Sequence, residues 1–172
     1  MGQSFVNECQ AQPSSDDFSA CLAQTESMLS SCGISHSMAN GTLLGHYRDG
    51  EPLPCDTNVD LYYRKGDRKQ VEQCLEEHNV PFARNFLRNR IEFCCPENRV
   101  QVDLHEIVPS LSNKYSCAIG QGNEFTTTDL LPFQDQLPHD PEAVLNSRYG
   151  RNAWKQADDD GNGGPGCWRI GF

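Results

Sequence analysis

The chain has no run of apolar residues long enough to cross a lipid bilayer. Its first seven residues contain neither a basic segment nor an apolar segment, so they do not resemble a secretory signal peptide. Basic residues are few, because 14 Lys and Arg stand against 24 Asp and Glu, which gives a formal net charge of −10. We therefore expect no integral membrane segment, no nucleic-acid partner and no binding to an anionic membrane surface, since both kinds of binding depend on positive charge.

Cysteine is abundant, with nine residues in a chain of 172. The sequence has no Cys-x-x-Cys motif and no Cys/His spacing typical of zinc, so a structural zinc site is disfavoured. Two interpretations of the cysteines remain. They form several disulfides in an oxidising compartment, or they are buried thiols that act as small apolar side chains, and we favour disulfides. The odd number leaves at least one cysteine outside an intramolecular pair. Cys94 and Cys95 are adjacent, so in a strand their side chains would point to opposite faces.

Hydrophobic periodicity and capping residues predict alternating helices and strands. A first helix begins after Ser14 or Ser15, with acids in its first turn, and ends at Gly33. The further predicted elements are a strand at 34–39, a short helix at 42–47, a strand at 58–63, a helix at 67–79, strands at 82–87, 90–94, 99–108 and 115–119, and a helix at 141–149. Asp140 is expected to cap this last helix, and Pro141 to open it.

This order of elements contains no internal repeat and predicts an α+β fold in a single domain, residues 14–154. Residues 1–13 are polar and without pattern, and we expect a flexible N-terminal arm there. Residues 155–172 are rich in Gly and Asp and are expected to form a tail that does not pack.

A small-residue turn opens the short helix at 42–47. Gly41 allows a phosphate to approach the backbone closely, and the hydroxyl group of Thr42 can donate a hydrogen bond to it. Arg48 could neutralise a second phosphate charge. Asn40-Gly41-Thr42 is also a glycosylation sequon, but a glycan would occupy the proposed phosphate site, so we predict that the sequon is not glycosylated.

Acidic side chains follow this turn at alternate positions. Asp56, Asn58 and Asp60 share one face if the segment is extended, and Asp103 lies among apolar residues of another predicted strand. Carboxylates that converge from two strands form an oxygen-ligand site for Mg²⁺ or Mn²⁺, ions that also bind phosphates. We expect these four residues to hold the metal and Asp60 and Asp103 to be catalytic, in the transfer of a phosphoryl-type group from a nucleotide. His105 shares the face of Asp103, but a histidine satisfied in the core or at the surface is the favoured role.

The same stretch resembles the LicD/fukutin family, a branch of the nucleotidyltransferase fold. The family signature is GTLLG, then Arg-x-Gly, then Pro-Trp-Asp-Asp-Asp-(Ile/Val)-Asp. The chain matches it at residues 41–45, 48–50, 54, 56, 59 and 60. Residues 102–104 resemble the strand that carries the third carboxylate, and residues 148–154 resemble the closing Tyr-Gly…Trp element of the family.

The resemblance implies a nucleotidyltransferase-like mixed sheet flanked by helices. It also implies metal-dependent transfer of a phospho-alcohol, such as phosphocholine or an alditol phosphate, from a CDP-linked donor to a hydroxyl group of a glycan or glycoprotein. In that reaction Gly41 and Thr42 would hold the donor phosphate, Asp60 would bind the metal, and Asp103 would bind the metal or take the proton of the acceptor. The Golgi lumen or the extracellular space is then favoured over the cytoplasm.

The chain departs from the family signature in three places. Cys55 replaces the tryptophan, Thr57 replaces the middle acid, and Asn58 replaces a metal-binding Asp. Asn keeps a carbonyl oxygen but loses a full negative charge, so the affinity for Mg²⁺ should fall unless Asp56 compensates. Two alternatives to an active enzyme therefore remain: a pseudoenzyme that binds nucleotide or glycan on the same fold, and a disulfide-rich secreted interaction protein.

Overall fold

The structure is a computed structural model that describes residues 9–54, 56–109, 114–116, 124–126 and 137–155. The first eight residues of the predicted arm and the predicted tail beyond Lys155 lie outside the described residues, as do Cys55, Cys117 and Cys167. None of the helices in the described part of the chain is both long and apolar enough to span a bilayer.

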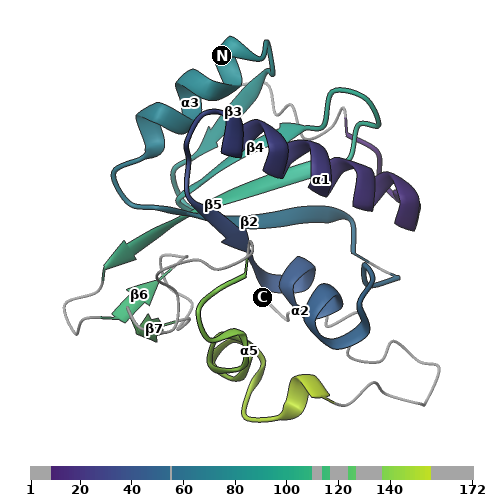
Figure 1. The fold of residues 1–172 in the computed structure, drawn as a ribbon, viewed down its shortest axis with the longest axis vertical. Helices are drawn as coiled ribbons and strands as arrows, with labels where there is room; N and C mark the ends of the chain where they lie inside the picture. Colours follow the sequence, from purple (N-terminus) through teal and green to yellow (C-terminus); the bar gives the residue numbers. More distant parts are fainter. Residues whose placement is uncertain (1–8, 55, 110–113, 117–123, 127–136, 156–172) are drawn as a thin grey trace.

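A mixed β-sheet forms the centre of the fold (Figure 1). Its five main strands lie in the order β1-β2-β5-β4-β3. They are β1 (His36–Met38), β2 (Asn58–Arg64), β3 (Phe82–Asn85), β4 (Arg90–Cys94) and β5 (Gln101–Pro109). β2 and β5 are parallel, whereas the other neighbours are antiparallel. The end of β5 also pairs with β6 (Lys114–Ser116), which pairs with β7 (Glu124–Thr126). The predicted α+β fold with a mixed sheet is confirmed.

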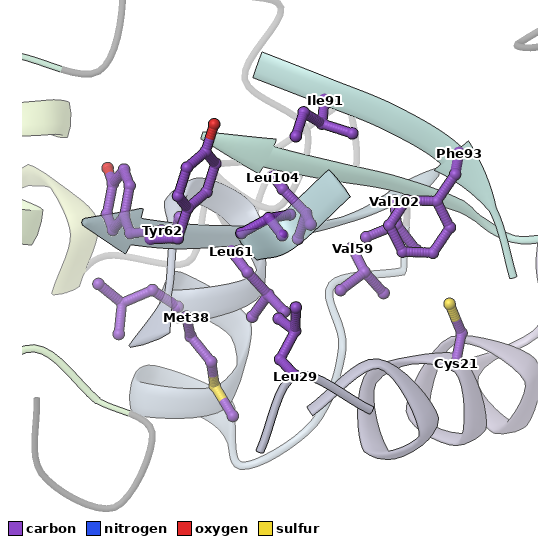
Figure 2. Packing of buried hydrophobic residues seen from close by; sticks show 14 of the residues in the cluster. Cys21, Leu29, Met38, Val59, Leu61, Tyr62, Ile91, Phe93, Val102 and Leu104 are labelled. Atoms are coloured by element: carbon purple, nitrogen blue, oxygen red, sulfur yellow. The ribbon is translucent and has the colours of Figure 1, made fainter. Parts of the chain in front are cut away.

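Strand alternation separates an apolar face of the sheet from a polar one. Leu61 of β2 and Leu104 of β5 are fully buried and point toward helix α1 (Ser15–Ser31), as Figure 2 shows. Asp60 and Asp103 alternate with these leucines along the same strands, so they lie on the opposite face. The core therefore forms on one side of the sheet and leaves the other side for polar chemistry.

Helix α1 covers the apolar face because its buried residues recur at intervals of three and four. Cys21 and Leu29 point from it into the core (Figure 2). The predicted start of α1 is confirmed, since the Ser14 hydroxyl oxygen accepts a hydrogen bond from the Asp17 backbone N–H at 3.1 Å. Helix α3 (Arg68–Glu77) lies beside α1 and is joined to it by a Cys32–Cys74 disulfide.

A second disulfide, Cys9–Cys94, joins the N-terminal segment to the end of β4. The backbone N–H of Gln10 also donates to the carbonyl oxygen of Arg99 at 2.7 Å, so the last residues of the predicted arm are anchored. Cys95 is buried, and its thiol lies 3.6 Å from the carbonyl oxygen of Cys21. The preference for disulfides over free thiols is thus confirmed for two pairs among the described residues.

The segment between β1 and β2 forms helix α2 (Asn40–Asp49). Asn40 has a left-handed backbone (φ 45°), which Asn tolerates better than most residues, and this turn redirects the chain from β1 into α2. Helix α5 (Pro141–Tyr149), whose N-cap is Asp140 as predicted, packs on α2. The two helices lie together in the lower part of Figure 1. A short 3-10 helix (Ala153–Lys155) follows α5.

Candidate functional site

Asp60 and Asp103 lie side by side on the polar face of the sheet. They are register partners on the parallel strands β2 and β5, and they are only 7% and 2% exposed. His105, two residues further along β5, lies with its Nε2 atom 2.6 Å from Oδ1 of Asp60. One ligand atom from each of the three side chains lies within 4.8 Å of the others. The cluster therefore has the donors and the spacing to surround a divalent cation.

His105 is buried and hydrogen-bonded, as favoured from the sequence, but its partner is a carboxylate of the site, which the sequence did not predict. The signal was its position two residues after Asp103, because alternate residues of a strand share a face. The side-chain amide nitrogen of Asn40 also lies 3.3 Å from the same ring nitrogen. Thus α2, β2 and β5 each contribute one polar side chain to this corner of the site.

The start of α2 packs directly against Asp56. A Cβ atom on residue 41 would lie 2.5 Å from Oδ2 of Asp56, so only glycine fits at Gly41. Oδ2 of Asp56 is buried and has no hydrogen-bond partner within the described part of the chain. The hydroxyl oxygen of Thr42 accepts the backbone N–H of Asp60 at 2.9 Å, which fixes α2 against β2. The helix N-terminus, Asp56 and Asp60 are thereby brought together.

Burial and mutual repulsion raise the pKa values of two of the three acids. Burial, followed by the charge on Asp60, raises the pKa of Asp56 to about 8. The same two causes raise the pKa of Asp103 to about 6, although Arg90 and His105 act in the opposite direction. A buried carboxyl group with a raised pKa takes up a proton or a cation, so the site favours binding of positive charge.

Arg90 and Glu92 of β4 extend this cluster, and neither residue was expected in the site from the sequence. A guanidinium nitrogen of Arg90 lies 2.5 Å from Oδ2 of Asp103, and its Nε lies 2.6 Å from Oε1 of Glu92. The amide of Asn85 also donates to Glu92 at 2.8 Å. The available signal was the alternation in β4, which places Arg90 and Glu92 on the face opposite the buried Ile91.

Asn58 lies at the start of β2 and contacts Asp103. Its amide nitrogen is 3.4 Å from Oδ2 of Asp103, while the amide of Gln101 donates to Oδ1 at 2.9 Å. Asp103 therefore accepts hydrogen bonds from two amides and from a guanidinium group. An Asp in place of Asn58 would repel Asp103 instead of donating to it.

Arg48 is placed apart from the acids, in the last turn of α2. Its guanidinium group pairs with Asp49 through contacts of 2.6 and 2.7 Å, and it reaches the carbonyl oxygen of Trp154 at 3.5 Å. The three residues that were predicted to bind phosphate thus lie at opposite ends of α2. Gly41 and Thr42 are beside the acids, and Arg48 is about two turns away.

The end of α5 approaches the same acids. Burial raises the pKa of the Tyr149 phenol above its ordinary value, and the nearby carboxylates of Asp60 and Asp56 add to this effect against the opposing charge of Arg148. Nε of Arg148 is buried and has no hydrogen-bond partner among the described residues. Residues 148 and 149, which resemble the closing element of the family signature, are therefore part of the wall around the acids.

The sequon at Asn40 is expected to carry no glycan even when the protein is produced in a secretory host. Oδ1 of Asn40 is buried and its amide lies against His105, so the side chain is directed into the site. Mass spectrometry of the tryptic peptide measures the occupancy. A variant with Phe86→Asn and Arg88→Thr creates a sequon at an exposed turn and serves as the positive control. Glycosylation of Asn40 at the level of this control would contradict the assignment of the site.

Residues 33–140 match the protein family described as LicD/FKTN/FKRP, nucleotidyltransferase domain. No curated protein sequence matches the chain significantly. Among solved structures, the antibiotic-resistance factor ANT(2'')-Ia has a TM-score of 0.55 and 10% sequence identity, over 81% of this chain and 74% of that chain. The lincomycin-bound lincosamide antibiotic adenylyltransferase LnuA has a TM-score of 0.46 and 14% identity, over 72% and 71% of the two chains. The first likeness shows a shared fold, and the second is too weak to carry an argument.

Proposed function

Because this chain belongs to the LicD/FKTN/FKRP family through its nucleotidyltransferase domain, we propose that it transfers a phospho-alcohol from a CDP-linked donor to a hydroxyl group of a glycan or a similar acceptor. The phospho-alcohol is of the phosphocholine or alditol phosphate type. Family membership supports a nucleotide-related transferase role. The identity of the donor, the acceptor and the divalent ion belongs to the proposal.

The observation that carries the proposal is the buried convergence of Asp60 and Asp103 beside the N-terminus of α2. The residues present fit a divalent ion, because oxygen donors of Asp60 and Asp103 converge and Oδ2 of Asp56 is buried with no partner in the segments that the structure describes. Asp56, Asp60 and Asp103, with the carbonyl oxygen of Asn58, would hold Mg²⁺ or Mn²⁺. The bound ion would neutralise negative charge on the transferred phosphate.

The protein's own groups have separate tasks in this reaction. The first backbone N–H groups of α2, at Gly41 and Thr42, are not used within the helix and would bind a donor phosphate. Asp103, with a pKa of about 6, is largely ionised at neutral pH and would accept the proton of the attacking hydroxyl group. Arg90 would hold Asp103 in a fixed orientation through their ion pair. Tyr149 would help to exclude water from the acids.

The proposal is tested by calorimetric titration of the protein with Mn²⁺ and with CDP. We expect CDP to bind more tightly in the presence of Mn²⁺. The substitution Asp60→Asn should weaken Mn²⁺ binding about tenfold, because it removes one of the charges that face the ion. Glu97→Gln is the matched control, since Glu97 is exposed and outside the site. Equal affinities of the Asp60→Asn variant and the wild type would contradict the metal assignment, and release of CMP from CDP-choline or CDP-ribitol reports turnover.

The contacts of Asp103 favour a second candidate, a protein that binds the CDP-linked donor without turning it over. Arg90 and the Asn58 amide both contact Oδ2 of this carboxylate, so its charge is compensated before any metal binds. A metal that binds there must displace these donors or share the oxygen with them. Donor binding without CMP release would favour this second candidate over the first.

A further inference from the structure

Two cysteines and a histidine meet where the ends of α1 and α3 touch, on the face of the sheet opposite the acids. Cys32 is the C-cap residue of α1, Cys74 lies near the end of α3, and His78 is the C-cap residue of α3. One ligand atom from each of the three lies within 4.8 Å of the others. Cys74 and His78 are four residues apart and so occupy the same face of the helix.

We propose that this junction is a second metal site, which binds a soft divalent ion such as Zn²⁺ when the Cys32–Cys74 disulfide is reduced. A dithiol reductant breaks the S–S bond by supplying two electrons and two protons, and is itself oxidised to a disulfide. The two thiols then lose their protons as the ion binds both sulfurs and the imidazole of His78. Water completes the four-coordinate site, which has three protein ligands.

The backbone already holds the three ligands near the required separation. The Cα atoms of Cys32 and Cys74 are 6.0 Å apart, and Nδ1 of His78 lies 4.0 Å from Sγ of Cys74. Two ligands on a tetrahedral zinc, with Zn–S of about 2.3 Å and Zn–N of about 2.0 Å, are roughly 3.5 Å apart. A shift of about half an ångström, within the range of a side-chain rotation, brings His78 to the ligand position. In this shift Nδ1 exchanges its 2.9 Å contact with the carbonyl oxygen of Cys74 for the ion.

The junction is also accessible to an ion and to a reductant. His78 is exposed and Cys32 is half-buried. A cavity of about 440 Å³ adjoins the junction, and Met28, Ser31 and His78 are among the residues that line it. An entry path is one of the requirements for a metal site that fills after the protein has folded.

The other disulfide provides an internal comparison. Among the described residues, Cys9 and Cys94 belong to no group of three or more potential metal ligands. The local sequence patterns that disfavoured zinc could not reveal the Cys32 site, because Cys32 and Cys74 are 42 residues apart and meet only in the folded chain. The part of this site that the sequence shows within one segment is the Cys74-x-x-x-His78 spacing.

The test uses Co²⁺, whose visible absorption reports tetrahedral thiolate coordination. The whole chain is reduced with a dithiol, freed of it by gel filtration without oxygen, and titrated with Co²⁺ and then with Zn²⁺. We expect one Co²⁺ with thiolate absorption, displaced by Zn²⁺ and lost when the disulfide forms again. The substitution His78→Ala should weaken Co²⁺ binding at least tenfold, whereas His139→Ala, at another exposed histidine, should not.

Two double variants distinguish this site from the other thiols of the reduced chain. Cys9→Ser with Cys94→Ser should keep the Co²⁺ spectrum, and Cys32→Ser with Cys74→Ser should abolish it. A reduced, folded wild type without thiolate–Co²⁺ absorption would overturn the proposal, as would a His78→Ala variant that binds Co²⁺ like the wild type. Circular dichroism confirms that each reduced protein is folded. The result does not depend on the acidic site, because that site contains no thiolate among its described residues.

Discussion

Replacing Asn58 with Asp is expected to tighten Mn²⁺ binding at the acidic site ten- to a hundredfold, since a carboxylate a few ångströms from the ion adds several kcal/mol of attraction even at the effective dielectric of a protein surface. In the wild type the Asn58 amide lies 3.4 Å from Oδ2 of Asp103 and helps to compensate that charge. In the variant the new carboxylate repels Asp103 until a cation arrives. Without metal, the variant should therefore be less stable than the wild type. It should nevertheless bind Mn²⁺ more tightly than the wild type does.

The measurement is a Mn²⁺ titration of the two proteins, together with the rate of CMP release from a CDP-linked donor. Asn79→Asp is the matched control, because Asn79 is exposed and lies beyond the end of α3. Turnover by both proteins supports an active enzyme, and turnover by the Asn58→Asp variant alone identifies the natural chain as a binding protein. If the variant binds Mn²⁺ no more tightly than the Asn79→Asp control, residue 58 is not a metal ligand.

The metal-free protein is expected to become less stable as the pH rises from 5 to 8. Asp56 has a pKa of about 8 in the folded chain against 3.8 as its ordinary value, so between these limits the folded state holds a proton that the unfolded state has released. Stability falls with pH wherever the folded state binds more protons. We expect the free energy of unfolding to fall by roughly 3 kcal/mol over this interval. This figure is smaller than the full pKa difference implies, because other charges share the site. Thermal unfolding at several pH values in the presence of a chelator measures it.

Asp56→Asn should remove the largest single contribution to this slope. A smaller slope remains, because burial also raises the pKa of Glu26 to about 7 and that of Asp103 to about 6. Added Mg²⁺ or Mn²⁺ should stabilise the wild type more at pH 8 than at pH 5, since the ion binds the ionised carboxylates. The exposed Glu97→Gln variant should keep the wild-type slope. An Asp56→Asn variant with an unchanged slope would show that this carboxyl group is not the main titrating group.

Features encoded within a few residues could be predicted from the sequence. Ser14 and Asp140 cap the helices that they were expected to cap, because a cap depends only on the next three residues. The strands that carry Asp60 and Asp103 were both predicted from their apolar patterns, and in the fold they pair in parallel with the two acids as register partners. The α+β fold and the location of the acids follow from such local signals together with the family resemblance.

Contacts that depend on the order of the strands could not be predicted. Arg90 meets Asp103 only because β4 lies next to β5, and nothing within β4 specifies that neighbour. His105 was expected on the same face as Asp103, but its 2.6 Å contact with Asp60 depends on the register of two distant strands. The pairing of the cysteines could not be predicted either, because the spacing of cysteines in the sequence does not define which of them form disulfides.

The parallel pairing of β2 and β5 also determines when the site forms. His105 and Asp60 are in contact although they are 45 residues apart in the sequence. Parallel strands pair only after the chain between them has crossed over, and contacts of large sequence separation form slowly. We therefore expect the acids to approach one another late in folding, after α3 and the β3–β4 hairpin have formed. Their repulsion then acts mainly on the rate at which the finished protein opens, and a bound cation would lengthen the lifetime of the folded state.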